Sequence, residues 1–162
     1  MEITKAELND LNEIFEIESE CFPKEQAASR ASIKERLEYY PDHFWLLKKD
    51  GIIISYVNGM CTDKKDLSDE MYSDVLMHDE NGNWQMLFGV CTRKQYRNKG
   101  YASKVIQACI EESKQKGRKG IVLTCLENRI PFYERCGFVN EGISSSVHGD
   151  VTWFQMRIRL DQ

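Results

Sequence analysis

Residues 84–126 constrain the fold more than any other part of the chain, because they predict a strand, a helix and a second strand in immediate succession. The apolar runs 84–92 and 120–126 are typical of buried strands. Between them, residues 101–116 place apolar side chains at the spacing of an amphipathic helix: Ala102, Val105, Ile106, Cys109 and Ile110. A strand–helix–strand connection makes its two strands parallel and is right-handed, so we expect a mixed α/β fold.

The other patterns predict short helices and further strands. Helical spacing is present over about 9–22 and 29–40, each stretch ending at a proline, and a short helix over 131–135 should end at Gly137. Strands are expected over 2–4, 43–48, 52–61 and 151–160. Asp50-Gly51 lies between the second and third of these, and this pair favours a tight hairpin turn.

Length and composition bound the class of protein. A chain of 162 residues, 41% of them hydrophobic, fits one globular domain, which we expect to span 1–162. The net charge of −4 gives no general attraction to nucleic acid or to an anionic membrane, and no apolar stretch approaches the roughly 18 residues of a membrane span. The six cysteines show no C-x-x-C pair and no His–Cys spacing, and no secretory leader is recognisable, so we expect free thiols, no metal site and a cytoplasmic location.

Residues 62–83 form a polar segment between two predicted strands, with seven acidic residues against two lysines. Structureless loops of this length are uncommon in compact domains and tend to be lids or binding loops. A solvated insertion is an equal alternative, and residues 67–72 are expected to form a helical turn.

Residues 97–102, Arg-Asn-Lys-Gly-Tyr-Ala, join the 84–92 strand to the following helix. A helix leaves its first backbone N–H groups without intrahelical acceptors and carries a positive dipole end there, so this turn is a candidate pyrophosphate site. Arg93, Lys94, Arg97 and Lys99 add local positive charge. An ordinary strand–helix turn, in which Gly100 serves only the backbone geometry, explains the same pattern equally well.

Residues 128–138, Asn-Arg-Ile-Pro-Phe-Tyr-Glu-Arg-Cys-Gly-Phe, resemble the coenzyme A signature of the GNAT superfamily of N-acetyltransferases. Residues 15–29 and 59–67 are similar to the arylalkylamine N-acetyltransferase branch, of the non-vertebrate type. The resemblance covers essentially the whole chain. It implies the GNAT fold, a mixed, mostly antiparallel central sheet flanked by about four helices, in which a parallel strand pair splays apart and binds acetyl-CoA.

The resemblance also implies a role for particular residues. Val90 would donate its backbone N–H to the oxyanion that forms during transfer, and Thr92 would bind the pantetheine. Tyr133 would contact the cofactor and protonate the departing thiolate, although alone it would be interpreted as a packing aromatic. The other residues that the resemblance assigns to acetyl-CoA are Cys91, Arg97, Asn98, Lys99, Gly100, Tyr101, Ala102, Ser103 and Asn128.

These motifs do not identify the group that removes a proton from the amine. A primary amine with a pKa of about 10.4 is nearly all cationic at pH 7 and must lose a proton before it attacks a carbonyl. Where vertebrate arylalkylamine acetyltransferases carry two histidines, this chain has Met86 and Phe88. His148 is the expected base, because imidazole titrates near neutral pH. A turn role for His148, with a water relay to an acidic side chain or to a backbone carbonyl, is an equal alternative, and His43 and His78 are weaker candidates.

The acceptor pocket is expected to contain Phe22, His148 and Trp153, which align with pocket positions of the family. Aromatic walls suit an aryl or alkyl chain and can hold an ammonium group. We therefore expect acetyl transfer to a primary amine of a small arylalkylamine or polyamine-like molecule, by direct attack in a ternary complex, in a monomer or weak homodimer. Acetylation of a protein N-terminus or lysine, and a catalytically weak CoA-binding module, are the alternatives.

Overall fold

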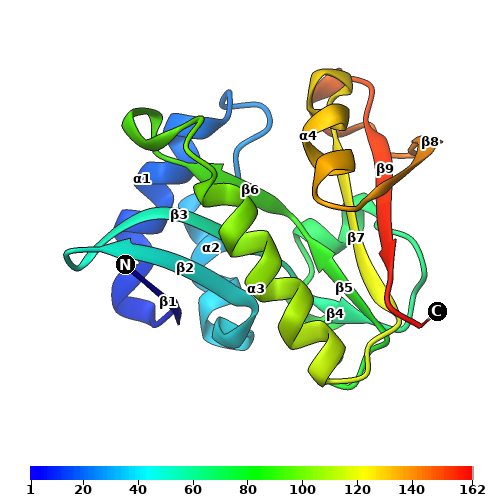
Figure 1. Cartoon of the computed structure of the whole chain (residues 1–162), viewed down its shortest axis with the longest axis horizontal. Helices are drawn as coiled ribbons and strands as arrows, with labels where there is room; N and C mark the ends of the chain where they lie inside the picture. Colours follow the sequence, from blue (N-terminus) through cyan, green and yellow to red (C-terminus); the bar gives the residue numbers. More distant parts are fainter. Residues whose placement is uncertain (162) are drawn as a thin grey trace. The chain divides into compact units, whose positions relative to one another are not determined.

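The computed structural model describes residues 1–161, which form two compact units (Figure 1). Unit 1 comprises Met1–Gly59 and Gly89–Cys109, and unit 2 comprises Met60–Phe88 and, among the described residues, 110–161. Each unit is built on its own sheet. No described helix has the length and apolarity needed to cross a membrane.

Unit 1 contains a four-stranded antiparallel sheet in the order β1-β2-β3-β6. Its strands are β1 (Glu2–Lys5), β2 (Phe44–Lys49), β3 (Ile52–Asn58) and β6 (Gly89–Thr92). The predicted hairpin between β2 and β3 is confirmed, with the turn residues Asp50 and Gly51 at φ of 52° and 78°. Positive φ at both turn positions matches the twist of the two strands, which is why Asp-Gly favours this turn.

Helices α1 (Leu11–Cys21) and α2 (Arg30–Tyr39) also belong to unit 1, and both were predicted by the helical spacing. In α1 the buried side chains Leu11, Ile14 and Ile17 lie on one face. Phe22 ends α1 in an extended conformation, because the proline that follows disfavours helical geometry in the preceding residue. Ser29 caps α2, since its hydroxyl accepts a hydrogen bond from the Ser32 N–H at 3.1 Å.

Unit 2 contains a five-stranded sheet in the order β4-β5-β7-β9-β8. Its strands are β4 (Cys61–Thr62), β5 (Trp84–Leu87), β7 (Gly120–Cys125), β8 (Val139–Ile143) and β9 (Phe154–Arg159), and α4 (Ile130–Arg135) belongs to the same unit. β5 and β7 pair in parallel, which confirms the strand–helix–strand prediction. Helix α3 (Tyr101–Gln115) begins in unit 1, ends in unit 2, and buries the predicted apolar stripe from Val105 to Ile110.

The structure corrects three strand boundaries. The stretch 84–92, predicted as one strand, is broken at Phe88 into β5 and β6, which belong to different sheets. The stretch 52–61 likewise divides into β3 and β4, and the last strand begins at Phe154 rather than at 151. β8 was not predicted, because most of its side chains are exposed and its residues show no apolar alternation.

Residues 62–83 pack against the rest of unit 2 through a few buried side chains, while most of their charged side chains are exposed. They contain the 3-10 turns η3 (Asp69–Tyr72) and η4 (Val75–Met77), the first of which confirms the expected helical turn. Leu67, Met71 and Val75 are buried. The segment is also held through polar contacts, since the buried Arg157 donates hydrogen bonds to the Lys65 carbonyl at 2.8 Å and to Asp66 at 2.6 Å.

Candidate active site

The expected oxyanion donor lies on β6, which is the edge strand of the unit 1 sheet and pairs with β3. Backbone N–H groups alternate between the two sides of a strand. The Arg93 N–H donates to the Ile54 carbonyl at 2.9 Å, so the N–H groups at odd-numbered positions of β6 face β3. The N–H groups of Val90 and Thr92 therefore point to the outer edge of this sheet, as an oxyanion donor requires.

The turn that follows β6 enters α3 with two residues in left-handed conformations, Asn98 at φ 62° and Gly100 at φ 82°. A Cβ added at Gly100 would meet no atom within 4 Å, so the backbone conformation, and not packing, calls for glycine there. α3 starts at Tyr101, followed by Ala102 and Ser103 in its first turn. Residues 97–100 are exposed, which leaves this turn open to an anionic ligand.

Arg97 is turned back from this loop toward the end of α1. Its Nε donates to the Thr92 carbonyl at 3.0 Å and its Nη2 to the Cys21 sulfur at 3.4 Å. Cys21 in turn donates to the same Thr92 carbonyl at 3.3 Å. The guanidinium thus fixes the geometry of the turn, a role that the sequence did not predict, and its contact with the cofactor stays a prediction.

Cys91 is buried in β6, between the two positions assigned to the oxyanion and the pantetheine. Its thiol lies 3.6 Å from Glu18 Oε1, and burial raises the pKa of the Cys91 thiol well above its usual value. Its carbonyl accepts a hydrogen bond from the Ser55 hydroxyl at 2.9 Å. The side chain of Cys91 therefore packs in the interior, and its backbone N–H and carbonyl face β3, so its assignment to acetyl-CoA stays a prediction.

Tyr133 and Asn128 belong to unit 2. Tyr133 is buried on α4 and its ring meets those of Phe132 and Phe138 edge-on, with centroid distances of 5.0 and 5.7 Å. Asn128 is exposed in the 3-10 turn η6 (Glu127–Arg129) that leads into α4. The aromatic contacts fix the Tyr133 ring, which suits a group that must present its hydroxyl in one position.

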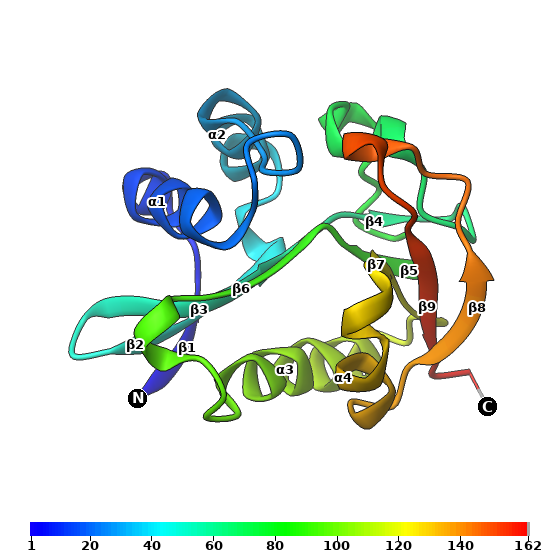
Figure 2. The same cartoon turned by 90° about the horizontal axis from the view of Figure 1, so that it is seen from above.

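An aromatic cluster in unit 2 collects two of the predicted acceptor residues. The ring of His148 is parallel to that of Tyr72, with centroids 5.6 Å apart, and lies 6.1 Å from that of Trp153. Tyr72 also packs on Phe88 at 4.6 Å. The Trp153 indole N–H donates to the His148 carbonyl at 2.6 Å. These four rings come from η3, from Phe88, which follows β5, and from the β8–β9 loop. The 69–77 turns and the β8–β9 loop lie side by side in Figure 2.

The third predicted acceptor residue, Phe22, is half-buried at the end of α1 in unit 1. Met86 and Phe88, at the positions of the family's histidines, are both apolar, and Met86 is fully buried. His43 is also buried, with its ring edge-on to those of Tyr40 and Trp45. A packing role accounts for His43.

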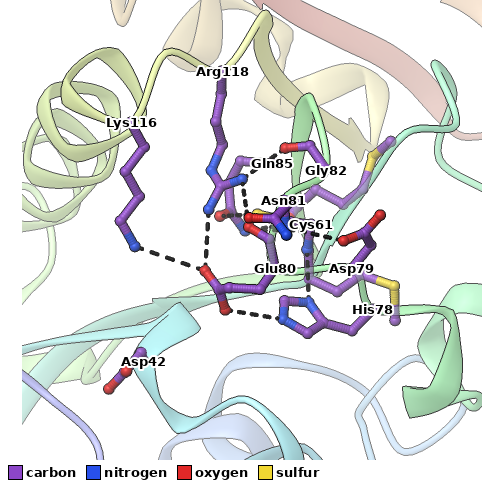
Figure 3. A network of polar contacts seen from close by, with 12 residues as sticks. Asp42, Cys61, His78, Asp79, Glu80, Asn81, Gly82, Gln85, Lys116 and Arg118 are labelled. Atoms are coloured by element: carbon purple, nitrogen blue, oxygen red, sulfur yellow. Dashed lines mark hydrogen bonds and ion pairs between the residues drawn. The ribbon is translucent and has the colours of Figure 1, made fainter.

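His78 takes part in a polar network at the base of the 62–83 segment (Figure 3). Its Nδ1 accepts a hydrogen bond from the Cys61 N–H at 3.1 Å, and its Nε2 lies 3.2 Å from Glu80. Glu80 also pairs with Arg118 at 3.2 Å and with Lys116 at 3.7 Å. An open polar cavity of about 330 Å³ adjoins the network, lined by residues 80–83 and 116–118, and no predicted site residue lines it.

Tyr72, which belongs to the aromatic cluster, and Asp69, which contacts the loop that carries His148, were missed in the sequence. Both lie in a segment whose acidic composition is typical of a solvated surface. One signal was available, since Leu67, Met71 and Val75 recur at intervals of four in this otherwise polar stretch and all three are buried. That interval indicates a folded turn with an inward face, which would have placed Tyr72 beside buried residues.

Comparison with known proteins shows the family of this chain. The family model described as "Acetyltransferase (GNAT) family" matches residues 11–138. The chain belongs to the GNAT family. As a GNAT acetyltransferase it is an acyltransferase that depends on acetyl-CoA, and the expected GNAT fold is confirmed.

Individual GNAT proteins are similar to this one at low sequence identity. Serotonin N-acetyltransferase of Mesocricetus auratus is 23% identical over 155 residues, covering 93% of this chain and 73% of the relative. The loading GNATL domain of CurA from Lyngbya majuscula has a TM-score of 0.85 at 14% identity, covering 98% and 97% of the two chains. The ribosomal-protein-S18-alanine N-acetyltransferase from Escherichia coli has a TM-score of 0.75 at 16% identity, covering 99% and 94%.

Proposed function

We propose that this GNAT enzyme transfers an acetyl group to the primary amine of a small molecule, an arylalkylamine or a polyamine-like amine, by direct attack in a ternary complex. The observation that carries this proposal is the cluster of Tyr72, Phe88, His148 and Trp153 in unit 2. Flat ring faces suit an aryl or alkyl chain and attract an ammonium group. The similarity to serotonin N-acetyltransferase supports the same class of acceptor.

The donor site proposed here includes β6 and the turn before α3. Acetyl-CoA supplies an acetyl thioester. The exposed turn at 97–100, with open space at Gly100 and the first turn of α3 behind it, fits a pyrophosphate. The residues that would hold the donor are Val90, Cys91, Thr92, Arg97, Asn98, Lys99, Gly100, Tyr101, Ala102, Ser103, Asn128 and Tyr133. The Val90 N–H would stabilise the charge that develops on the carbonyl oxygen.

Two side chains would handle protons. His148 would accept a proton from the ammonium form of the acceptor, because neutral amine is the nucleophile and imidazole can take up a proton near neutral pH. Tyr133 would donate a proton to the thiolate that leaves. Phe22, His148 and Trp153 would line the acceptor side.

The same proposal includes the location, domain organisation, oligomeric state and partners of the enzyme. We place it in the cytoplasm as a single domain over 1–162, a monomer or weak homodimer, with a small amine as its partner and no nucleic acid. All six cysteines are free, as expected in a reducing compartment. Acetylation of a protein N-terminus or lysine is the second candidate within the family, and the Escherichia coli neighbour is named as an alanine N-acetyltransferase of ribosomal protein S18. A catalytically weak CoA-binding module is the third.

An acceptor panel separates these candidates. Protein is mixed with acetyl-CoA and, separately, with tryptamine, phenethylamine, spermidine or a peptide, and release of free thiol is measured. We expect release with one or more of the small amines. Release with the peptide alone would support protein acetylation, and tight acetyl-CoA binding without release would support the binding module.

Two variants test the proton roles. Tyr133→Phe should lower turnover by about 100-fold or more, the usual contribution of a general acid, while the Kd for CoA stays nearly unchanged. An equal loss in CoA binding would mean that Tyr133 is structural.

His148→Ala should move the acidic limb of the pH–rate profile, and an unshifted limb would remove His148 as the base.

A further inference from the structure

The β8–β9 loop, which carries His148, is tied to the 62–83 segment by one carboxylate. Asp69 Oδ1 accepts a hydrogen bond from the Ser146 hydroxyl at 2.5 Å, and Asp69 Oδ2 accepts one from the Val147 N–H at 3.0 Å. Asp69 is half-buried. Both of its oxygens are therefore directed at the loop that precedes His148.

The contact continues from Ser146 to the aromatic cluster. The Ser146 oxygen accepts a hydrogen bond from the His148 N–H at 3.3 Å, and the His148 carbonyl accepts one from the Trp153 indole at 2.6 Å. Asp69 thus begins a chain of hydrogen bonds that fixes the backbone of His148 on both sides. The positions of His148 and Trp153 depend on this chain of hydrogen bonds.

The same 3-10 turn supplies a second contact. Asp69 and Tyr72 are the first and last residues of η3, and side chains three residues apart lie on the same side of a 3-10 helix. While Asp69 holds the loop backbone, the Tyr72 ring stacks on the His148 ring, and the Tyr72 hydroxyl lies 3.3 Å from Thr124 Oγ1 on β7. η3 therefore connects the loop to the central strand of the unit 2 sheet.

We infer that Asp69 is a positioning residue for the acceptor side of the enzyme. Asp69 holds the 144–150 loop against Tyr72 and thereby keeps His148 and Trp153 in place. The acceptor half of this inference rests on the proposed function, whereas the tie between Asp69 and the loop does not. Anchoring by a carboxylate is well suited to this task, because charge-assisted hydrogen bonds are shorter and stronger than neutral ones.

The test compares three variants of the full chain. Asp69→Ala removes both hydrogen bonds. Asp69→Asn keeps an oxygen for the Val147 N–H and gains an N–H that can bond the Ser146 hydroxyl. Asp63→Ala is the matched control, since Asp63 is an acidic residue of the same segment that accepts two hydrogen bonds, both from Asn83 and both at 3.0 Å.

Hydrogen exchange measures directly whether Asp69 holds the β8–β9 loop. In Asp69→Ala the amides of Val147 and His148 should exchange about tenfold faster or more, as expected when a charged partner is lost, while Asp69→Asn and Asp63→Ala stay near wild type. Melting temperatures report whether each variant folds. If Asp69→Ala does not fold, Ser146→Ala, which removes the hydroxyl that bonds Asp69 Oδ1 and the His148 N–H, should speed exchange at His148 more than at Val147, whose N–H keeps Asp69 Oδ2. Unchanged exchange at both amides overturns the inference, whatever the acceptor is.

Steady-state kinetics measure the acceptor role. In Asp69→Ala the KM for the best amine of the panel should rise about tenfold, the equivalent of one lost charged hydrogen bond, with the KM for acetyl-CoA within twofold of wild type. Asp69→Asn should restore most of the amine KM. Faster exchange without a rise in the amine KM, or an equal rise in both KM values, overturns the positioning role. A wild-type enzyme that acetylates no amine would instead contradict the proposed function. The exchange rates of the Val147 and His148 amides would still show whether Asp69 holds the loop.

Discussion

The thiol of Cys21 shows how one side chain takes its chemistry from its neighbours. A hydrogen bond from the Cys91 thiol and contacts with Arg97 lower the pKa of the Cys21 thiol to about 7, against the opposing effect of partial burial. Thiolate is the nucleophilic form of cysteine, and its fraction rises as pH passes upward through the pKa. Cys21 should therefore be reactive at neutral pH, beside the turn assigned to the cofactor.

We predict that iodoacetamide labels Cys21 faster than the buried thiols, with a half-maximal rate near pH 7. The controls are in the same chain, since burial raises the pKa of Cys61 to about 12 and that of Cys125 to about 11. The measurement is the mass increase of each cysteine peptide against pH. A free cysteine thiol has a pKa of about 8.5. A Cys21 labelling profile with its midpoint at or above that pH would contradict the effect of Cys91 and Arg97 on the Cys21 pKa.

Arg97→Ala separates the contribution of the guanidinium to this effect. Without the Arg97 Nη2 at 3.4 Å from the sulfur, the pKa of Cys21 should move back up toward its usual value. Labelling at pH 7 should then slow by several-fold, whereas labelling at pH 10 should change little. Equal slowing at both pH values would indicate altered access to Cys21.

At the scale of elements, the turn between β6 and α3 depends on the left-handed conformation of Gly100. Alanine there would fit the available space but would pay about 1–2 kcal/mol for positive φ. Because the strain can be relieved by moving the turn, we predict that Gly100→Ala weakens acetyl-CoA binding by about tenfold, as judged by calorimetry.

Gly117 provides the matched control for this prediction. It lies just after α3 at φ 70°, also with no atom within 4 Å of an added Cβ, but outside the turn assigned to the cofactor. Gly117→Ala should lower the free energy of unfolding by a similar ~1 kcal/mol and leave acetyl-CoA affinity unchanged. Equal losses of affinity in the two variants would mean that the effect at Gly100 is general destabilisation.

Elements with a local signal could be predicted, and those decided by distant contacts could not. Asp50-Gly51 and the stripe of α3 carry their own turn and helix signals. The break at Phe88 has no such signal, because 86–91 reads as one apolar run. The structure places Gly89 against α1 and β3, where a Cβ would lie 3.4 Å from Glu18 and 3.2 Å from Asn58. Those neighbours are 71 and 31 positions away, so no local pattern could show them.

The candidate site was predictable to a similar extent. Most residues assigned to the cofactor lie in two continuous stretches with recognisable motifs, and His148 and Trp153 were assigned to the acceptor side by resemblance. Asp69 and Tyr72 were not, because their importance comes from contacts with Ser146, Val147 and His148 more than 70 positions later.

At the scale of the whole molecule, donor binding is linked to folding. A ligand that binds only the native state adds RT ln(1 + [L]/Kd), or about 2.7 kcal/mol at 100 times Kd. For a chain of this size we predict a rise in melting temperature of roughly 5–11 °C with acetyl-CoA. Acetylpantetheine, which lacks the pyrophosphate, should give a smaller shift at the same concentration. Equal shifts would argue against a phosphate site at residues 97–103.

The aromatic cluster is assembled from residues 72, 88, 148 and 153, whereas the turn assigned to the donor is one continuous stretch at 97–103. Variation can therefore accumulate in 62–83 and 144–153 without touching the donor stretch. A library randomised in those two segments should yield enzymes with new acceptor preferences that all still use acetyl-CoA. In evolutionary terms, such an enzyme can change its substrate while inheriting its cosubstrate.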